Sequence, residues 1–377
     1  MTAAPVFDKG LANTIAAETQ ASFIDGAKGV LEYVGYDIDS LARNSTFEET
    51  VFLLWNRRLP NAAELAKLSA ELRAEYDLPE AVWQMIRETP RTAHPMHMLR
   101  TLVSALGMFD READDNSPEA NWRKSVRLLA KTPTIVANFD RHRKGKPLVR
   151  PDATMDMATN FLNMLNGARP TVAVAKALDV CLILHADHGL NASTFAARVT
   201  ISTLSDMYSA ITTAIGTLKG PLHGGANEMA MEMLKDLDKD CAGGKMTTDA
   251  WMQRAFAEKR KLMGFGHRVY KNGDHRAGIL RRWGLKLAEQ MGPSAKKWFD
   301  MGDEVQAIML RDKNIHPNVD FPCGMTYFIM GIPVPQYTPI FVAARITGWC
   351  AHIMEQHQNN RIIRPLAEYQ GAMNLKW

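Results

Sequence analysis

Apolar residues recur at intervals of three and four along most of this chain, which is the spacing of one face of an α-helix. The clearest block opens at His94-Pro95 and continues through Met96, Leu99, Val103 and Leu106. Three further blocks have the same spacing: residues 153–166, 172–185 and 341–356. We therefore expect a chain built mainly of packed helices, and we find no internal repeat in the sequence.

The strongest strand signal lies near the N-terminus. Residues 22–36 predict a small β-hairpin with a glycine-containing turn. Two overlapping capping boxes follow, Ser45 with Glu48 and Thr46 with Glu49, and they predict the start of a helix. Three prolines then mark the starts or stops of helical blocks: Pro60, Pro79 and Pro90.

The composition suits a folded globular protein. The chain has 377 residues, of which 46% are hydrophobic and 23% charged, so it can bury a large core in one large domain or two unequal ones. Its net charge of +4 does not require a nucleic-acid partner and is compatible with a small anionic substrate. The most basic run, residues 141–150, has no interleaved aromatic residues, so we expect a solvated loop between two helices there.

Several other classes of protein lack support in the sequence. The four cysteines are widely spaced and form no Cys-x-x-Cys pair, which argues against a finger-type zinc site and a disulfide framework. The N-terminus has no basic region followed by an apolar run, and no stretch approaches the roughly 18 apolar residues of a membrane span. We expect a cytoplasmic protein without a membrane partner.

Three short motifs carry the candidate chemistry. His223 lies in Gly-Pro-Leu-His-Gly-Gly, His267 in Gly-Phe-Gly-His-Arg, and Asp320 in Pro-Asn-Val-Asp-Phe. Two imidazoles and one carboxylate can remove a proton from carbon on one substrate while polarising a carbonyl on another. Three further residues suit small carboxylates, because a guanidinium binds them with two parallel hydrogen bonds: Arg276, Arg345 and Arg364.

Each of these groups also has an ordinary alternative. A glycine loop that runs into a helix places His223 at the positive end of the helix dipole, which disfavours imidazolium. Taken alone, such a histidine is as well explained by capping or packing at the helix start. Apolar neighbours would desolvate Asp320 and raise its pKa from about 3.9, whereas a lone aspartate is more often a helix or turn cap.

Dinucleotide and metal sites receive little support. The glycines at 264 and 266 would let the backbone approach a ligand closely, but the third glycine and the preceding strand of a dinucleotide fingerprint are missing. His185 and His188 are three residues apart and could share one helix face, yet no further ligand stands at a spacing diagnostic of a metal. We expect neither a metal nor a bound cofactor.

Taken together, these motifs resemble the citrate synthase family. The resemblance follows the family's order from the hairpin to Arg364-Pro365 and includes His94-Pro95-Met96, residues 185–195 and Arg345-Ile346-Thr347-Gly348-Trp349. It implies an almost all-helical homodimer, in which a small helical domain closes over the substrates. The implied large domain comprises residues 1–224 and 336–377, and the small domain comprises residues 225–335.

The resemblance also implies a role for each candidate residue. Asp320 matches the base that removes a methyl proton from acetyl-CoA, and His223 matches the donor to the thioester oxygen. His267 matches the group that polarises the oxaloacetate ketone, and Ser193 matches a serine that orients His223. The remaining matches are to oxaloacetate binders: His188, Arg276, Arg345 and, acting across the dimer interface, Arg364.

The coenzyme A contacts are less clearly defined by the motifs. The candidates are Phe265, Gly266, Arg268, Lys271, Lys313 and Asn318. The sequence departs from the family at Pro322-Cys323, where relatives have an aromatic residue and then serine, and proline removes a backbone N–H. The chain also ends at Trp377, soon after Arg364, so we expect tail contacts across the dimer to be missing.

Two alternatives to a citrate synthase of the tricarboxylic acid cycle stay open. A 2-methylcitrate synthase uses propionyl-CoA with the same fold and catalytic residues, and one extra methyl group gives only about 1–3 kcal/mol of discrimination. A non-catalytic homologue that serves as a scaffold is disfavoured, because both histidines, the aspartate and all three arginines are retained. The sequence favours the citrate synthase.

Overall fold

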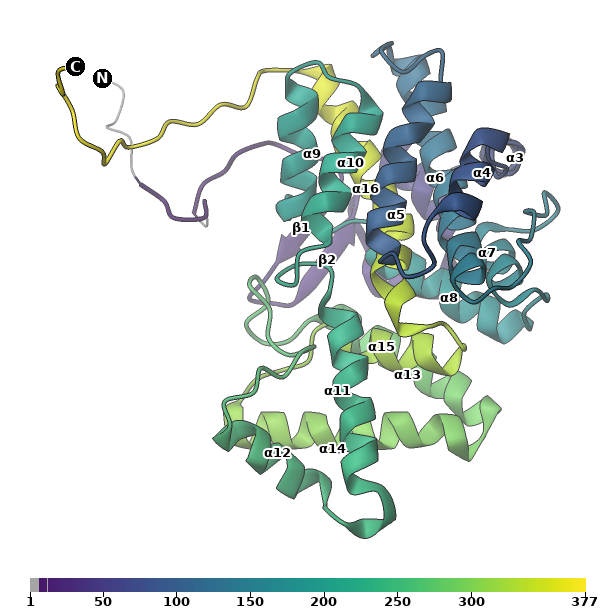
Figure 1. Cartoon of the computed structure of the whole chain (residues 1–377), viewed down its shortest axis with the longest axis vertical. Helices are drawn as coiled ribbons and strands as arrows, with labels where there is room; N and C mark the ends of the chain where they lie inside the picture. Colours follow the sequence, from purple (N-terminus) through teal and green to yellow (C-terminus); the bar gives the residue numbers. More distant parts are fainter. Residues whose placement is uncertain (1–6, 12) are drawn as a thin grey trace.

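The structure, a computed structural model that describes residues 7–11 and 13–377, is mainly helical (Figure 1). An antiparallel sheet near the N-terminus has the strand order β1-β2-β3, comprising β1 (Ser22–Asp25), β2 (Val30–Tyr33) and β3 (Tyr36–Asp37). The helices up to the middle of the chain are α1 (Ile38–Asn44), α2 (Phe47–Asn56), α3 (Ala62–Ala74), α4 (Glu80–Glu88), α5 (Pro95–Leu106), η1 (Gly107–Phe109), α6 (Pro118–Arg143), α7 (Met157–Asn166) and α8 (Val172–His185). Those that follow are α9 (Ala192–Ser202), α10 (Met207–Leu218), α11 (Ala226–Cys241), η2 (Ala242–Gly244), α12 (Thr248–Ala257), α13 (His275–Met291), α14 (Pro293–Lys313), α15 (Asp320–Ile329), η3 (Val334–Gln336) and α16 (Tyr337–Gln358).

This architecture confirms the predicted fold class. The hairpin forms as expected, with a third short strand added to it, and α8 has the predicted bounds. Helix α7 begins four residues later than the pattern indicated, and α16 extends beyond both predicted ends. The three prolines lie between successive helices of the α2–α5 region, as predicted.

Only one of the two predicted capping boxes forms. The Thr46 hydroxyl accepts the Glu49 N–H at 3.2 Å, and the Glu49 carboxylate accepts the Thr46 N–H at 2.7 Å. The prediction for Ser45 and Glu48 was wrong, because Glu48 is buried and accepts the Met157 N–H at 2.9 Å, at the start of α7. Tertiary packing thus uses the Glu48 carboxylate at the start of α7, so it does not cap α2.

The basic run begins in the last turn of α6 and continues as a mainly exposed loop. Arg141 is buried in the last turn of α6 and donates to the carbonyls of Pro147 and Leu165. Arg150 forms ion pairs with Asp77 and Glu80. Residues 144–150 form a mainly exposed loop between α6 and α7, as expected, whereas the expectation was wrong for Arg141, which is buried in the helix.

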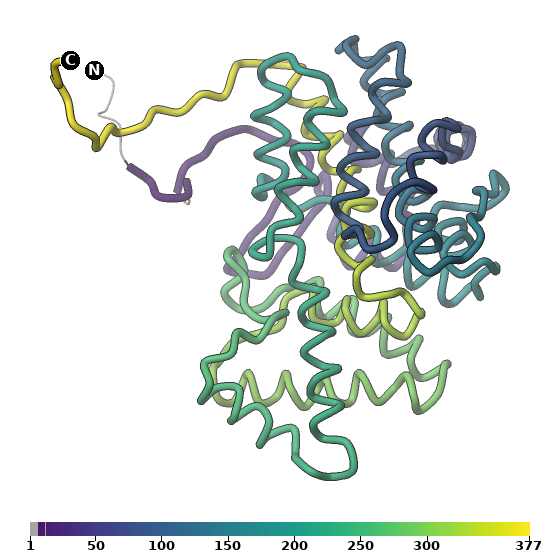
Figure 2. Tube along the Cα trace, viewed as in Figure 1, coloured from purple at the N-terminus to yellow at the C-terminus, as the bar shows by residue number. Residues whose placement is uncertain are grey.

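The helices gather around one continuous hydrophobic core. In Figures 1 and 2, α11, α12 and α14 lie at one end of the molecule and α5, α6, α9 and α10 at the other, while α16 runs through the latter group. The predicted domain boundaries fall just before α11 and inside η3. The division into two domains stays a prediction. In the described part of the chain, helices of the length and apolarity needed to cross a bilayer do not occur.

The capping box at α2 can be tested by substitution. Thr46→Ala should lower the free energy of unfolding by about 1 kcal/mol, because an N-cap oxygen satisfies a backbone N–H at the helix start. Urea unfolding followed by circular dichroism measures this. Thr101→Ala is the control, since this exposed threonine inside α5 bonds only its own helix and should change the free energy by less than about 0.5 kcal/mol. Equal losses in both variants would contradict the cap.

Candidate active site

The predicted catalytic residues come from segments that are far apart in the sequence. His188 lies in the turn after α8, His223 in the loop before α11 and His267 in the loop before α13, while Asp320 opens α15. The rings of His188 and His267 lie 5.3 Å apart. Arg276 of α13 and Arg345 of α16 are close enough to Asp320 to affect its pKa. The fold therefore gathers most of the predicted residues in one place.

Backbone pairing places the His267 loop beside the start of α15. Phe265 and Pro317 form an antiparallel bridge. The Gly266 N–H donates to the His316 carbonyl at 2.8 Å, and the Asn318 N–H donates to the Gly264 carbonyl at 2.9 Å. A side chain at 264 would lie 2.8 Å from the Phe321 Cβ, and φ there is +85°, so the position requires glycine.

Asn318 completes this pairing with its side chain. Its amide donates to the Gly266 carbonyl at 2.9 Å, and its side-chain oxygen accepts the Asp320 N–H at 3.0 Å. The residue is buried, so both bonds are shielded from water. Asn318 thus links the backbone next to His267 with the backbone of Asp320.

Asp320 is suited to act as a base near neutral pH. Burial raises its pKa to about 7, with Asp274 adding to the rise while Arg276 and Arg345 oppose it. Its Oδ1 atom is covered and has no hydrogen-bond partner among the described residues. The alternative that Asp320 is only a cap is therefore not supported.

His223 is held by Ser193 from the first turn of α9. Its Nε2 lies 2.8 Å from the Ser193 hydroxyl oxygen, which also accepts the Trp349 indole N–H at 3.1 Å. Burial, reinforced by Arg345, lowers the pKa of His223 to about 4, so the ring is neutral at pH 7. The sequence predicted a neutral ring from the helix dipole, and in the fold burial is the main cause.

The histidines at 188 and 267 are also neutral. Burial, with Arg276 next, lowers the pKa of His267 to about 4 and holds that of His188 well below its usual value. The Nδ1 atom of His267 accepts two backbone N–H groups, from Val269 at 3.0 Å and Tyr270 at 3.2 Å. The Nε2 atom of His188 lies 3.0 Å from the Tyr270 hydroxyl.

Two of the three predicted arginines lie buried at the site. Arg276 is paired with Asp274 through Nε at 3.0 Å and Nη2 at 2.8 Å; although burial opposes it, Asp274 raises the Arg276 pKa. The Arg345 Nε donates to the His185 carbonyl at 2.7 Å, and burial lowers its pKa to about 10. The charges of Asp187 and Asp320 oppose this lowering from a distance, and neither carboxylate forms a direct ion pair with Arg345 in the described chain.

Arg364 does not join this cluster within its own chain. It is exposed in the extended segment after α16, which Figure 1 shows leading away from the helices.

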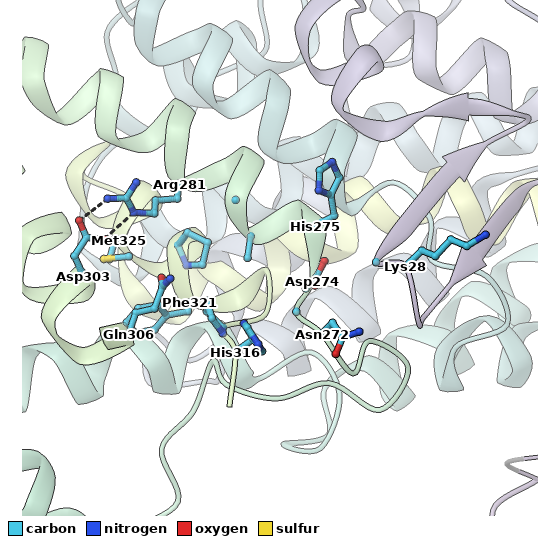
Figure 3. Close-up of a pocket in the computed structure, with 16 residues that line it drawn as sticks. Lys28, Asn272, Asp274, His275, Arg281, Asp303, Gln306, His316, Phe321 and Met325 are labelled. Atoms are coloured by element: carbon cyan, nitrogen blue, oxygen red, sulfur yellow. Dashed lines mark hydrogen bonds and ion pairs between the residues drawn. The ribbon is translucent and has the colours of Figure 1, made fainter. Parts of the chain in front are cut away.

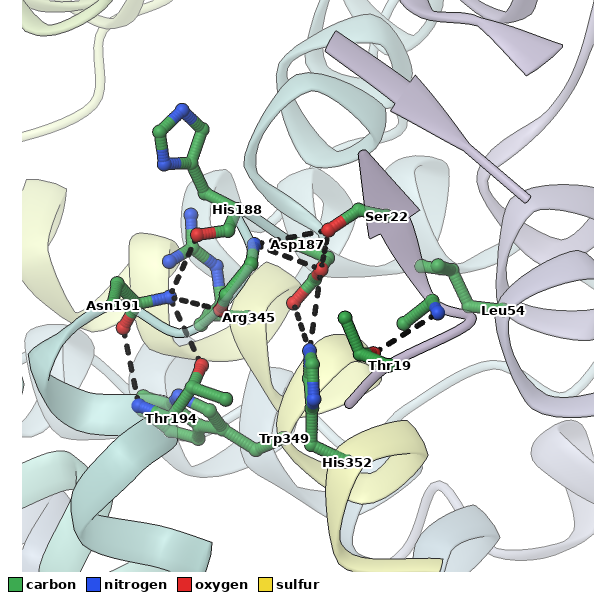
Figure 4. A network of polar contacts seen from close by, with 12 residues as sticks. Thr19, Ser22, Leu54, Asp187, His188, Asn191, Thr194, Arg345, Trp349 and His352 are labelled. Atoms are coloured by element: carbon green, nitrogen blue, oxygen red, sulfur yellow. Dashed lines mark hydrogen bonds and ion pairs between the residues drawn. The ribbon is translucent and has the colours of Figure 1, made fainter. Parts of the chain in front are cut away.

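A polar network holds the turn that carries His188 (Figure 4). The Asp187 carboxylate accepts the Ser22 hydroxyl at 2.6 Å and lies 3.3 Å from the His352 Nε2. A side chain at Gly348 would lie 2.3 Å from the Asp187 Oδ1, so only glycine fits there. His185 is the last residue of α8, and its Nδ1 lies against the Cys181 carbonyl. Because His188 lies beyond the end of this helix, the two histidines do not share a helix face as the sequence suggested.

The predicted coenzyme A residues lie around the His267 loop. Arg268 and Lys271 are exposed, and the Arg268 guanidinium donates to the Gly10 carbonyl at 3.2 Å. Lys313 is exposed at the end of α14, with its ammonium 4.4 Å above the Phe256 ring. Phe265 packs against Phe321, with the two ring centroids 4.6 Å apart.

A pocket of about 290 Å³ lies beside the first turns of α13 and α15 (Figure 3). Its lining includes Asp274, His275, His316, Phe321, Pro322 and Met325. Pro322 is the third residue of α15, where a backbone N–H has no partner within the helix, so its missing N–H breaks no helix bond. The departure at Pro322-Cys323 is thus compatible with an intact α15.

Sequence reasoning missed Asp274 and Tyr270 as parts of the site. Asp274 is two residues before Arg276, a spacing that would have suggested a partner for the guanidinium. No local sequence pattern pointed to Tyr270, because its partner His188 lies 82 residues earlier, in the turn after α8.

Comparisons with known proteins agree with this geometry. The sequence profile described as "Citrate synthase, C-terminal domain" matches residues 10–366. A citrate synthase from Haloferax volcanii is 46% identical over 371 residues, covering 97% of this chain and 96% of that protein. A 2-methylcitrate synthase from Mycobacterium tuberculosis is 42% identical over 369 residues, covering 97% of this chain and 91% of that protein. A citrate synthase from Thermoplasma acidophilum has been solved as a ternary complex with carboxymethyl coenzyme A and oxaloacetate. It matches with a TM-score of 0.92 at 33% identity, covering 99% of this chain and 98% of that chain.

The helical fold and these relatives define a condensing enzyme. The chain belongs to the citrate synthase family. Because both citrate synthases and 2-methylcitrate synthases are among its relatives, family membership leaves the acyl substrate open.

The raised pKa of Asp320 predicts a stability cost above neutral pH. The unfolded carboxyl ionises near 3.8 and the folded one near 7, so folding loses stability as pH rises through this window. Asp320→Asn removes the charge and should stabilise the protein by up to about 4 kcal/mol at pH 8 and by little at pH 4. Chemical unfolding at both pH values measures the difference.

Asp303→Asn provides the control for this measurement. Asp303 pairs with Arg281 on the outer side of α13 and is partly exposed. Its substitution should not give a gain that grows with pH. A pH-independent effect of Asp320→Asn would mean that the carboxyl titrates as it does in water.

Proposed function

We propose that this protein is a citrate synthase that condenses acetyl-CoA with oxaloacetate and hydrolyses citryl-CoA to citrate and coenzyme A. The observation that carries the proposal is a carboxyl with a pKa of about 7, Asp320, gathered with neutral histidines and buried arginines. A weakly acidic carbon requires a base of this strength together with stabilisation of the anion that forms. Membership of the citrate synthase family supports the same reaction.

In the proposed mechanism, Asp320 takes a proton from the methyl group of acetyl-CoA. His223 shares its N–H proton with the thioester oxygen in a hydrogen bond, which stabilises the enol over a free enolate. The enol carbon attacks the oxaloacetate ketone, and His267 polarises that ketone and supplies the proton to its oxygen. Water then cleaves the thioester of citryl-CoA. Ser193 keeps the ring of His223 in place.

Oxaloacetate is a dianion, and its proposed binding site is cationic. Arg276 and Arg345 keep their charge in a buried site better than lysine would, since the guanidinium is far less acidic. His188 completes the site within one chain. We propose that Arg364 acts on the active site of the other subunit of a homodimer, since it is remote from the site of its own chain. A cytoplasmic location, without a nucleic-acid or membrane partner, is part of the same proposal.

Coenzyme A would lie along the exposed edge of the His267 loop. Arg268, Lys271 and Lys313 offer positive charge for its phosphates. Backbone at Phe265 and Gly266, with the Asn318 side chain, would border the pantetheine or adenine. The ternary complex of the Thermoplasma acidophilum relative, which contains carboxymethyl coenzyme A and oxaloacetate, supports a shared site for both substrates.

The second candidate is a 2-methylcitrate synthase that uses propionyl-CoA, because an enzyme with that name is 42% identical to this chain. The same residues would have the same roles. A scaffold protein without activity is the remaining alternative.

Thiol release separates these candidates. Purified protein should release thiol from acetyl-CoA only when oxaloacetate is present, and faster than from propionyl-CoA. Asp320→Asn should lower kcat by about 10²–10⁴-fold while oxaloacetate still binds, because the base is lost and the dianion site is kept. A preference for propionyl-CoA would identify a 2-methylcitrate synthase, and no release from either thioester would favour the scaffold.

Mixed dimers test the role of Arg364. Arg364→Ala and Asp320→Asn homodimers should each be nearly inactive. A mixed dimer should regain one active site, because one cleft then has both a native Asp320 and the native Arg364 of the partner subunit. After unfolding and refolding in equal amounts, about a quarter of wild-type activity is expected from random pairing. No recovery would indicate that Arg364 serves its own subunit.

A further inference from the structure

Tyr270 lies among the residues of the proposed oxaloacetate site, although the sequence did not predict it there. It is 3% exposed and lies in the loop between His267 and Arg276. Its ring centroid is 5.4 Å from that of His188 and 4.8 Å from that of His267. The Arg276 guanidinium carbon lies 6.0 Å from the ring. Tyr270 therefore lies beside side chains from two separate loops and from α13.

The backbone of Tyr270 helps to determine where His267 carries its proton. The Nδ1 atom of His267 accepts the Tyr270 N–H at 3.2 Å and the Val269 N–H at 3.0 Å. Backbone N–H groups only donate, so Nδ1 must present its lone pair. Because the neutral ring has a single N–H, that proton lies on Nε2.

The hydroxyl of Tyr270 helps to determine where His188 carries its proton. The His188 Nε2, 3.0 Å away, is its hydrogen-bond partner within the described chain. Burial raises the pKa of Tyr270 to about 12, so the phenol keeps its proton at pH 7. A phenol is a much better donor than acceptor, and a neutral imidazole nitrogen is a good acceptor. The Tyr270 hydroxyl therefore donates to Nε2, which leaves the His188 proton on Nδ1.

We infer that Tyr270 sets the tautomers of both imidazoles, through its hydroxyl for His188 and through its backbone N–H for His267. It acts as a positioning residue and leaves one N–H of each ring free for a substrate oxygen. The consequence for oxaloacetate rests on the proposed function, whereas the proton positions do not. Since His188 follows α8 and Tyr270 precedes α13, the hydroxyl bond also joins two segments that are 82 residues apart.

Tyr270→Phe separates the two effects, because it removes the hydroxyl but keeps the ring and the backbone N–H. Nitrogen-15 NMR of histidine-labelled protein at pH 7, without substrate, reports which ring nitrogen has the proton. His188 and His267 are assigned from the signals lost in His188→Gln and His267→Gln. In Tyr270→Phe we expect His188 to become a mixture of tautomers, while His267 stays protonated on Nε2.

Kinetics should show the same separation. Loss of one hydrogen bond should raise the KM for oxaloacetate by about 3- to 10-fold, with kcat changed by less than about 3-fold, because His267 keeps its proton position. Tyr208→Phe is the matched control. Tyr208 is also 3% exposed, and its hydroxyl donates to Asp110 in another part of the fold, so its KM for oxaloacetate should stay at the wild-type value.

Unchanged His188 signals in Tyr270→Phe would overturn the role of the hydroxyl. A wild-type His267 with its proton on Nδ1 would overturn the role of the backbone. Equal KM increases in Tyr270→Phe and Tyr208→Phe would show a general packing effect and would also overturn the inference. If wild-type protein releases no thiol, the proposed function fails, and the NMR result still decides the tautomers.

Discussion

The backbone pairing between residues 264–266 and 316–318 is the constraint on which the proposed active site depends. It consists of a single β-bridge, a few backbone hydrogen bonds and the side chain of Asn318. Through it, the loop that carries His267 lies next to the first residue of α15. Gly264 permits this approach, because the neighbouring chain leaves no room for a Cβ.

Burial then determines the protonation states of the gathered groups. It raises the pKa of the Asp320 carboxyl and lowers that of each of the three site histidines. The result is a base that can work near neutral pH among uncharged imidazoles. The same burial weakens the fold, since a desolvated carboxylate costs stability whenever it is ionised. Arg276 has Asp274 as a direct ion-pair partner, whereas Asp187 and Asp320 act on the charge of Arg345 only from a distance.

The small N-terminal sheet helps to hold the turn that carries His188. Ser22 of β1 binds the turn after α8 (Figure 4). The hydroxyl of Tyr33 in β2 binds the same turn at the Asp187 carbonyl. His352 of α16 holds the same turn from the other side, through Asp187. His188 is therefore presented by a turn fixed from two directions, and Tyr270 meets it there.

The sequence alone determined the helical fold class, several individual helices, the hairpin and the identity of the chemical groups. Helix periodicity and capping patterns are local, so they were readable, and the motifs around His223, His267 and Asp320 pointed to the family. Only the tertiary structure decided which contacts those groups make. It assigned Glu48 to Met157 instead of a local cap, and it gave Arg141 buried partners in place of solvent. The parts played by Asp274 and Tyr270 also emerged only there. The physical reason is that pKa values and hydrogen-bond partners depend on burial and on neighbours from distant segments, which no local pattern encodes.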